Sequence, residues 1–380
     1  RRKGSAVGTG VGAGSRRWGG CIDRDRGWGT GPPAPRRAAV GARTCATDAG
    51  RITAALPVAT EGTEAPGPAK FTDPDRTAKG EQRAVVPLQR LDTLWINTGT
   101  LCNITCANCY IESSPLNDRL VYVSAAEVAP FLDEASALGT REIGFTGGEP
   151  FMNPEFCDML GDALARGPEV LVLTNAMQPM QRGEIQRRLI ALNDRFGRRL
   201  TMRVSLDHHS QALHETERGE GTWDKAISGL DWLSRNGFRI AIAGRTRWGE
   251  SEADARAGYA ALIAQRGWDL DVNDPARLVL FPEMDAGDDV PEITTACWGI
   301  LGKSPADVMC SSSRMVVKRK GEVRPTVLPC TLLPYDRAFE MGTTLAEAAR
   351  ADGGMFAAGA VKLCHPHCAK FCVLGGGSCS

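Results

Sequence analysis

Residues 92–110 read DTLWINTGTLCNITCANCY, and this stretch decides how the rest of the chain is interpreted. Its first part, Asp92–Thr98, has the apolar residues and the length of a buried strand. Three cysteines follow at once, at Cys102, Cys106 and Cys109. Three thiolates within eight residues can hold one [4Fe–4S] cluster and leave its fourth iron without a protein ligand. The stretch therefore predicts a strand that leads into an iron–sulfur site with one open coordination position, where a substrate or cofactor can bind.

A zinc site and three simply packed thiols are the alternatives for the same cysteines. Zinc would need a fourth ligand, and the nearest histidine in the sequence, His208, is far away. Packed thiols rarely have this spacing at the end of a strand.

The segment that follows alternates between strand and helix patterns. Further strands are expected at 142–146, 169–174, 200–206, 238–243 and 277–281, with helices at 124–138, 153–165, 181–193, 222–236 and 252–265. This alternation is typical of βαβ units around a parallel sheet, so the fold class is α/β. Six strands fit a partial (β/α)6 TIM-like barrel, and a flat doubly wound sheet is the alternative that periodicity cannot separate from it. In both folds the active site lies at the carboxyl ends of the strands.

The cysteine spacing CxxxCxxC, followed by the aromatic Tyr110 and placed after a first barrel strand, resembles the motif of the radical SAM superfamily. The resemblance implies that Cys102, Cys106 and Cys109 bind a [4Fe–4S] cluster whose open iron chelates S-adenosylmethionine. It also implies that this cofactor is cleaved reductively to a 5′-deoxyadenosyl radical, which abstracts hydrogen from a substrate. Tyr110 is expected among the residues that bind the cofactor.

The second expected strand ends in Thr-Gly-Gly-Glu-Pro, residues 146–150. Two glycines allow a ligand to approach the backbone closely, and a carboxylate beside them suits an ammonium group. Alone, this segment would be read as an ordinary strand-to-helix turn. After the cysteine loop it resembles the superfamily's GGE motif, which implies that Gly147, Gly148 and Glu149 bind the amino group of S-adenosylmethionine.

Polar residues also end the third and fourth expected strands. The resemblance implies that Asn175 belongs to the cofactor site, that Ser205 and Asp207 contact the ribose or the methionine carboxylate, and that Arg218 contacts that carboxylate. As ordinary residues these four would be caps or turns. The adjacent His208 and His209 are interpreted as turn residues, with a catalytic role as the alternative.

A second group of cysteines occupies the C-terminal part of the chain, at Cys297, Cys310, Cys330, Cys364, Cys368, Cys372 and Cys379. It resembles the SPASM/twitch extension of radical SAM enzymes and implies one or two auxiliary [4Fe–4S] clusters, preceded by a hairpin over 316–330. The long gap from Gly321 to Cys330 and the last three spacings depart from the usual pattern, so the ligand assignment stays open. A structural zinc site that includes His365 or His367 is the alternative. Cys157 lies alone in an expected helix and is assigned to core packing.

Composition limits the remaining possibilities. The 380 residues carry no net charge, but residues 1–50 carry +7 and the rest carry −7, so nothing indicates nucleic-acid binding. No run of 18 apolar residues and no N-terminal secretion signal are present, which predicts a cytoplasmic protein without a membrane partner. The expected division is a disordered and non-native segment at 1–84, a core domain at 85–295 and an auxiliary cluster domain at 296–380.

The expected activity is that of a radical SAM oxidoreductase or maturase. We favour a peptide or protein substrate by a small margin, with an electron donor such as flavodoxin or ferredoxin as partner. A small-molecule metabolite as substrate and a non-catalytic Fe–S electron-transfer protein are the alternatives. The acidic segment at 281–289 could border the mouth of the substrate site, or simply be solvated.

Overall fold

A computed structural model describes residues 69–281 and 289–375. These described residues belong to one compact unit. Residues 1–68, 282–288 and 376–380, with Cys379 among them, lie outside the described residues. Within the described ranges no helix has both the length and the apolar composition needed to cross a membrane.

One open sheet of eight strands organises the fold, in the order β7-β6-β5-β4-β3-β2-β8-β9. Six of its strands are the predicted ones, all parallel: β2 (Thr93–Asn97), β3 (Glu142–Thr146), β4 (Glu169–Thr174), β5 (Leu200–Ser205), β6 (Arg239–Arg245) and β7 (Leu278–Phe281). The connecting helices are α1 (Ala125–Ala137), α2 (Phe156–Ala165), α3 (Gln178–Gln181), α4 (Gly183–Phe196), α5 (Gln211–Arg218), α6 (Trp223–Arg235) and α7 (Glu252–Arg266). The α/β prediction is confirmed, although the sequence patterns missed α3 and α5.

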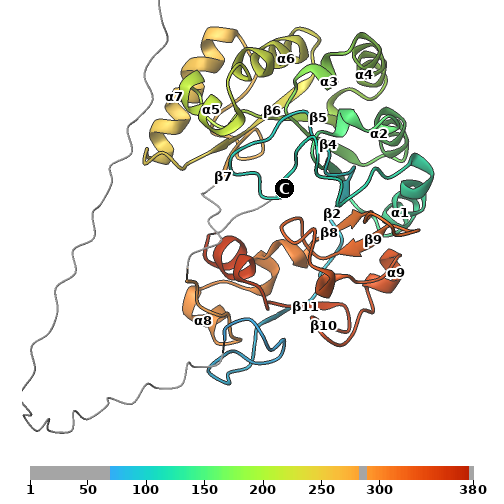
Figure 1. Cartoon of the computed structure of the whole chain (residues 1–380), viewed down its shortest axis with the longest axis vertical. Coiled ribbons are helices and arrows are strands. Elements are labelled where there is room, and N and C mark those ends of the chain that lie inside the picture. The colour runs from blue at the N-terminus through green and yellow to red at the C-terminus, as the bar shows by residue number, and fades with distance from the viewer. Residues whose placement is uncertain (1–68, 282–288, 376–380) are drawn as a thin grey trace, which may run out of the picture. The chain divides into compact units, whose positions relative to one another are not determined.

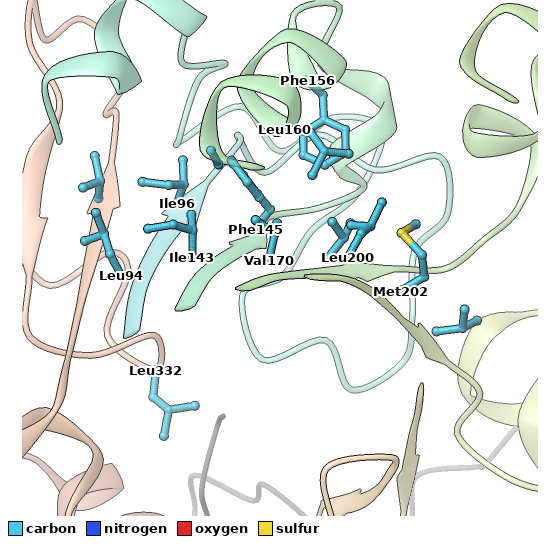
Figure 2. Packing of buried hydrophobic residues seen from close by; sticks show 14 of the residues in the cluster. Leu94, Ile96, Ile143, Phe145, Phe156, Leu160, Val170, Leu200, Met202 and Leu332 are labelled. Atoms are coloured by element: carbon cyan, nitrogen blue, oxygen red, sulfur yellow. The ribbon is translucent and has the colours of Figure 1, made fainter. Parts of the chain in front are cut away.

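The two faces of this sheet are covered differently. Alternate residues such as Ile96, Phe145 and Val172 pack in the main core against the helices, which lie along the outer side of the strands in Figure 1. Figure 2 shows part of this layer, where the Phe156 ring meets Phe145 edge-on at 5.3 Å. The opposite face carries a separate, smaller apolar cluster that includes Trp95. Helices on one face and an enclosed interior on the other fit the expected partial barrel and exclude a doubly wound sheet.

Local signals account for where the first helix begins. Ser124 precedes α1, its hydroxyl accepts the Glu127 amide hydrogen, and the Glu127 carboxylate accepts the Ser124 amide hydrogen at 3.0 Å. This is the predicted capping box, and it satisfies two backbone donors that the helix itself leaves unpaired.

The C-terminal part contributes strands to both sheets of the fold. The predicted hairpin is present as β8 (Ser313–Val317) and β9 (Thr326–Leu328), but β8 also pairs in parallel with β2. A second sheet joins β1 (Val85–Val86), β11 (Ala360–Lys362) and β10 (Phe356–Ala357), and the short helices α8 (Cys297–Leu301) and α9 (Leu345–Ala348) complete this part. The expected boundary at 295/296 therefore does not separate two sheets, because the main sheet takes strands from both sides of it.

Part of the segment expected to be disordered is folded. Residues 69–84 are described, and the Arg83 guanidinium is buried, 2.7 Å from the Glu292 carboxylate. The same carboxylate accepts the amide hydrogens of Phe71 and Ala78. For residues 69–84 the prediction of disorder is wrong, because polar contacts to a distant residue stabilise a segment that has few apolar side chains of its own.

Close packing inside the barrel can be tested at Gly144 of β3. It pairs with Trp95, and a Cβ atom at Gly144 would lie only 2.4 Å from the indole ring. We expect Gly144→Ala to destabilise the chain by about 1–3 kcal/mol, because neither the sheet nor the buried ring can move away freely. The measurement is urea unfolding of the iron-free chain.

Gly161→Ala in α2 is the matched control. Its added Cβ would meet only a Leu192 methyl group at 3.5 Å, an ordinary contact. Alanine is also the better helix former, so this variant should be as stable as the parent or slightly more stable. Equal stability of both variants would contradict the packing described here.

Candidate active site

One cavity at the carboxyl ends of the strands brings together most of the residues that the sequence predicted for the first cluster and its cofactor. All three thiols of the first cysteine loop line it, and none of them is in a disulfide. The other predicted residues on its wall are Tyr110, Gly147, Gly148, Asn175, Ser205, Asp207 and Arg218. Three free thiols next to a polar pocket fit both a cluster and a second ligand on its open iron, since cysteine thiolates are the usual cluster ligands.

The two glycines after β3 press directly on the cysteine loop. Gly148 donates its amide hydrogen to the Gly99 carbonyl at 2.8 Å, and a Cβ atom at Gly148 would lie 2.2 Å from the Leu101 carbonyl oxygen. Gly147 has a φ of +148°, which residues other than glycine rarely adopt. The glycines are therefore required so that the backbone after β3 can support the loop that carries Cys102.

Glu149 is placed differently from what its sequence context suggested. It is 1% exposed and is absent from the described residues that line the cavity. Its carboxylate accepts hydrogen bonds from the Thr174 hydroxyl and the Asn175 amide, both at 2.8 Å. Burial raises the pKa of this carboxyl to about 7, although these hydrogen bonds oppose the shift. The Glu149 side chain thus ties β3 to the end of β4 and positions Asn175, which faces the cavity.

Asp207 and two arginines form a buried ion cluster on the cavity wall. The Asp207 carboxylate lies 2.5 Å from Nε of Arg218 and 3.2 Å from Nε of Arg245. Burial raises the pKa of the Asp207 carboxyl, but the two guanidinium groups outweigh it and hold that pKa below its ordinary value. Asp207 therefore stays ionised and fixes the direction in which Arg218 presents its remaining N–H groups.

Glu217 clamps the middle of the cysteine loop. Its carboxylate accepts hydrogen bonds from the backbone and side-chain nitrogens of Asn108 at 2.8 and 2.9 Å, and its carbonyl accepts the Ala107 amide hydrogen at 2.7 Å. Arg247 lies 2.7 Å from the same carboxylate, and Arg245 donates to the Asn108 carbonyl at 3.0 Å. The loop segment between Cys106 and Cys109 is thus held by the last turn of α5 and the end of β6.

Burial keeps two thiols of this loop, Cys102 and Cys106, in the neutral form when no metal is bound. Burial raises the pKa of Cys102 to about 12 and also raises the pKa of Cys106. Because iron binds the thiolate form, loading of a cluster here must release protons.

Four of the C-terminal cysteines interact electrostatically with one another. Burial raises the pKa of the Cys368 thiol well above its ordinary value, and the adjacent Cys372, Cys310 and Cys364 raise it further. Cys368 and Cys372 share the π-helical segment Cys368–Leu374, and Cys372 also lines the cavity that holds the first cysteine loop. With Cys310 and Cys364 these make four thiols outside any disulfide, which match in number and kind the donor set of a complete [4Fe–4S] site.

The sulfur atoms of two further C-terminal cysteines accept backbone hydrogen bonds. The Cys297 sulfur accepts the Thr294 amide hydrogen at 3.3 Å, and the Cys330 sulfur accepts the Leu332 amide hydrogen at 3.2 Å. Cys157 is a residue of α2 and is buried in the core, as expected for a packing residue. Their ligand roles stay predictions.

His208 and His209 are outside the described wall of the cavity. His208 accepts the Ser210 amide hydrogen at Nδ1 and lies 3.0 Å from the Glu250 carboxylate at Nε2. A ligand atom from each of His208, His209 and Glu250 lies within 4.8 Å of the others. The hydrogen bonds of His208 account for this arrangement without an ion, which agrees with the turn interpretation.

Sequence reasoning missed two residues that organise the site, Glu217 and Arg245. Arg245 is the last residue of β6, so the rule that polar residues at strand ends face the site could have identified it. No comparable signal existed for Glu217, because its partner Asn108 is 109 positions away. The apolar residues Leu332 and Phe371 of the C-terminal part also line the cavity and were not anticipated.

Comparison with known proteins agrees with this geometry. The family model of the radical SAM superfamily matches residues 96–249. Residues 96–249 form a radical SAM domain. This domain implies a [4Fe–4S] cluster and S-adenosylmethionine as its cofactors, and the residues on the cavity wall fit both. The resemblance stated for the cysteine motif is confirmed, and the auxiliary cluster domain stays a prediction.

The individual relatives are distant in sequence, and each matches only part of this chain. The antilisterial bacteriocin subtilosin biosynthesis protein AlbA of Bacillus subtilis is 28% identical over 37% of this chain and 30% of its own length. A GTP 3′,8-cyclase of Shewanella denitrificans is 25% identical over 40% of this chain and 44% of its own. The chain thus matches less than half the length of these relatives. A crystal structure of Streptococcus suis SuiB bound to the precursor peptide SuiA is similar in fold, with a TM-score of 0.51. The two chains are 14% identical, and the match covers 70% of this chain and 66% of the SuiB chain.

The Glu217 clamp leads to a prediction about cluster loading. We expect Glu217→Ala to lose about 3 kcal/mol of stability, because it leaves Arg247 and the Asn108 amide without their buried partner. The freed loop should also hold less iron at the first site. Urea unfolding and iron analysis per chain measure the two effects.

Glu220→Ala is the matched control, since Glu220 lies three residues further on and is exposed. It should leave both stability and iron content unchanged. A Glu217→Ala chain with the parent's iron content and stability would show that the clamp is unnecessary.

Proposed function

We propose that this chain is a radical SAM enzyme that cleaves S-adenosylmethionine reductively and abstracts hydrogen from a peptide or protein substrate. The observation that carries the proposal is the shared cavity, in which three free thiols face Gly148, Ser205 and Arg218. An electron-transfer protein would need the thiols but no polar pocket beside them. The non-catalytic alternative therefore leaves the polar wall unexplained.

Some residues of the chain would hold the cluster, and others would position S-adenosylmethionine beside it. Cys102, Cys106 and Cys109 would hold the [4Fe–4S] cluster, which when bound supplies the electron for cleavage of S-adenosylmethionine and so the hydrogen-abstracting radical. Arg218, oriented by Asp207, would take the methionine carboxylate through charge-assisted hydrogen bonds.

The remaining polar groups on the wall would complete the cofactor site. Ser205 at the end of β5 is placed for a hydrogen bond to the ribose or the carboxylate, and Asn175 is held in place by Glu149. The backbone at Gly147 and Gly148 would approach the amino group, as in the family motif. Tyr110, next to the last cysteine of the loop, would cover the adenosine part of the cofactor.

The character of the cavity supports a peptide side chain as substrate. Its described wall includes Trp95, Ile111, Leu173, Phe281, Leu332 and Phe371, and its only cations in the described residues are Arg218 and Arg245. Both guanidinium groups are already paired with Asp207. A wall of this kind suits an uncharged or apolar group, and the name of AlbA places that relative in the biosynthesis of a bacteriocin.

A small-molecule substrate is the second candidate, favoured by the similarity to the GTP 3′,8-cyclase. A nucleoside triphosphate would need cations free to pair with its phosphates. The described wall offers no arginine or lysine that lacks a carboxylate partner, so the cavity supports this candidate less well than a peptide.

The test is anaerobic reconstitution with iron and sulfide, followed by reductant and S-adenosylmethionine. We expect 5′-deoxyadenosine and methionine from the parent chain, and none from Cys106→Ala, which should retain its auxiliary iron. Flavodoxin or ferredoxin should replace the chemical reductant. A fully loaded parent that forms no 5′-deoxyadenosine would exclude the enzyme and favour an electron-transfer protein.

The substrate class needs a separate experiment. Short peptides encoded next to this protein should change in mass only when the loaded enzyme, reductant and S-adenosylmethionine are all present. Deuterium from a labelled peptide should then appear in 5′-deoxyadenosine. Transfer of deuterium from a labelled nucleotide, with no effect on any peptide, would decide for the small-molecule alternative.

A further inference from the structure

Arg314 on β8 is a buried cation, with only 2% of its surface exposed. Its guanidinium donates to the carbonyls of Cys310 and Ser313, both at 2.7 Å, and to the carbonyl of Gly359 at 3.2 Å. All three acceptors are neutral, and the Nε atom of Arg314 has no hydrogen-bond partner. The side chain is therefore positioned by the backbone while its charge is uncompensated.

Other buried arginines in the same part of the chain are paired with carboxylates. Arg83 lies 2.7 Å from Glu292, and the Arg319 guanidinium contacts Glu340. Among the described residues, Arg314 has no carboxylate within 4.0 Å. A buried charge without a counter-charge costs several kcal/mol, so an arginine retained in such a place indicates a missing anion.

A predicted cluster ligand lies directly against the guanidinium. The Cys310 carbonyl accepts the Arg314 hydrogen bond at 2.7 Å, and the Cys310 side chain is buried and interacts electrostatically with the guanidinium. The cysteine pattern predicts Cys310, with Cys364, Cys368 and Cys372, as a ligand of an auxiliary cluster, and a bound cluster would turn these thiols into thiolates. A [4Fe–4S] cluster held by four thiolates is a net anion, and reduction adds one more negative charge to it.

We infer that Arg314 is the counter-cation of an auxiliary [4Fe–4S] cluster bound by Cys310, Cys364, Cys368 and Cys372, and that it raises the reduction potential of that cluster. The inference rests on the proposed function, because the cluster itself comes from it. A fixed positive charge beside the cluster favours the more negative, reduced state. Because Cys372 lines the main cavity, a cluster tuned in this way would lie where it can exchange an electron with a substrate radical.

The first test measures the potential of the auxiliary cluster alone. The full chain with Cys102, Cys106 and Cys109 changed to alanine is reconstituted, and its cluster is titrated by EPR at controlled potentials. Adding Arg314→Gln should lower the reduction equilibrium constant about tenfold or more, which is a midpoint about 59 mV more negative for one electron. Arg314→Lys keeps the charge and should stay near the parent value. An unchanged midpoint in Arg314→Gln would overturn the inference.

The second test separates the role of the charge from a structural role. In the iron-free chain Arg314 faces a neutral thiol, so Arg314→Gln should melt at the same temperature as the iron-free parent or higher. In the loaded chain the same change removes the counter-charge, and the variant should melt below the loaded parent. A variant that fails to fold, or melts lower by the same amount in both states, would show that Arg314 is only structural and overturn the inference.

Failure of the inference and failure of the proposed function give different results. If the triple-alanine chain binds no iron, the auxiliary cluster is absent and the inference is wrong, while 5′-deoxyadenosine formation by the unaltered chain can still establish the enzyme. If the chain binds about four irons at this site and Arg314→Gln leaves its potential unchanged, the auxiliary cluster stands and only the role of Arg314 is lost.

Discussion

The parallel pairing of β2 with β3 on one side and β8 on the other is the constraint on which the rest of the structure depends. The carboxyl end of β2 leads directly into the first cysteine loop, so its pairing with β3 brings that loop against Gly147 and Gly148. Its pairing with β8 sets Arg314 beside Leu94 and attaches the C-terminal cysteines to the barrel. One strand therefore relates two cysteine sets that are far apart in the sequence, and Cys372 of the second set lines the same cavity as the first.

Buried arginines near the two cysteine sets have different partners. Near the first loop, Arg218, Arg245 and Arg247 each lie within salt-bridge distance of Asp207 or Glu217, and these ion pairs fix the geometry of the loop. Near the second set, Arg314 donates to backbone carbonyls and, among the described residues, has no carboxylate partner. The contrast has a physical reason if the second site binds an anionic cluster whose charge changes, since a paired arginine would contribute little to the balance between two redox states.

The ends of the strands were predictable, and the contacts between distant segments were not. Asn175, Ser205 and Asp207 were found because parallel strands bring their carboxyl ends to the same side of a sheet. Glu149 was expected to bind the amino group of the cofactor, but its carboxylate turns toward the end of β4, which local sequence does not specify. The segment 69–84 was misjudged because its low apolar content is compensated by Glu292, more than 200 positions away.

The sequence by itself determined the cysteine loop after the first strand, the alternation that makes a parallel barrel, and the polar residues at the strand ends. These features are local, since each depends on spacing within one or two neighbouring elements. The tertiary structure alone decided that β8 joins the sheet beside β2, that Glu217 clamps the loop at Asn108, and that Arg314 is buried without a carboxylate. Each of these depends on which distant surfaces meet and exclude water, and burial of that kind leaves no periodic signal in the chain.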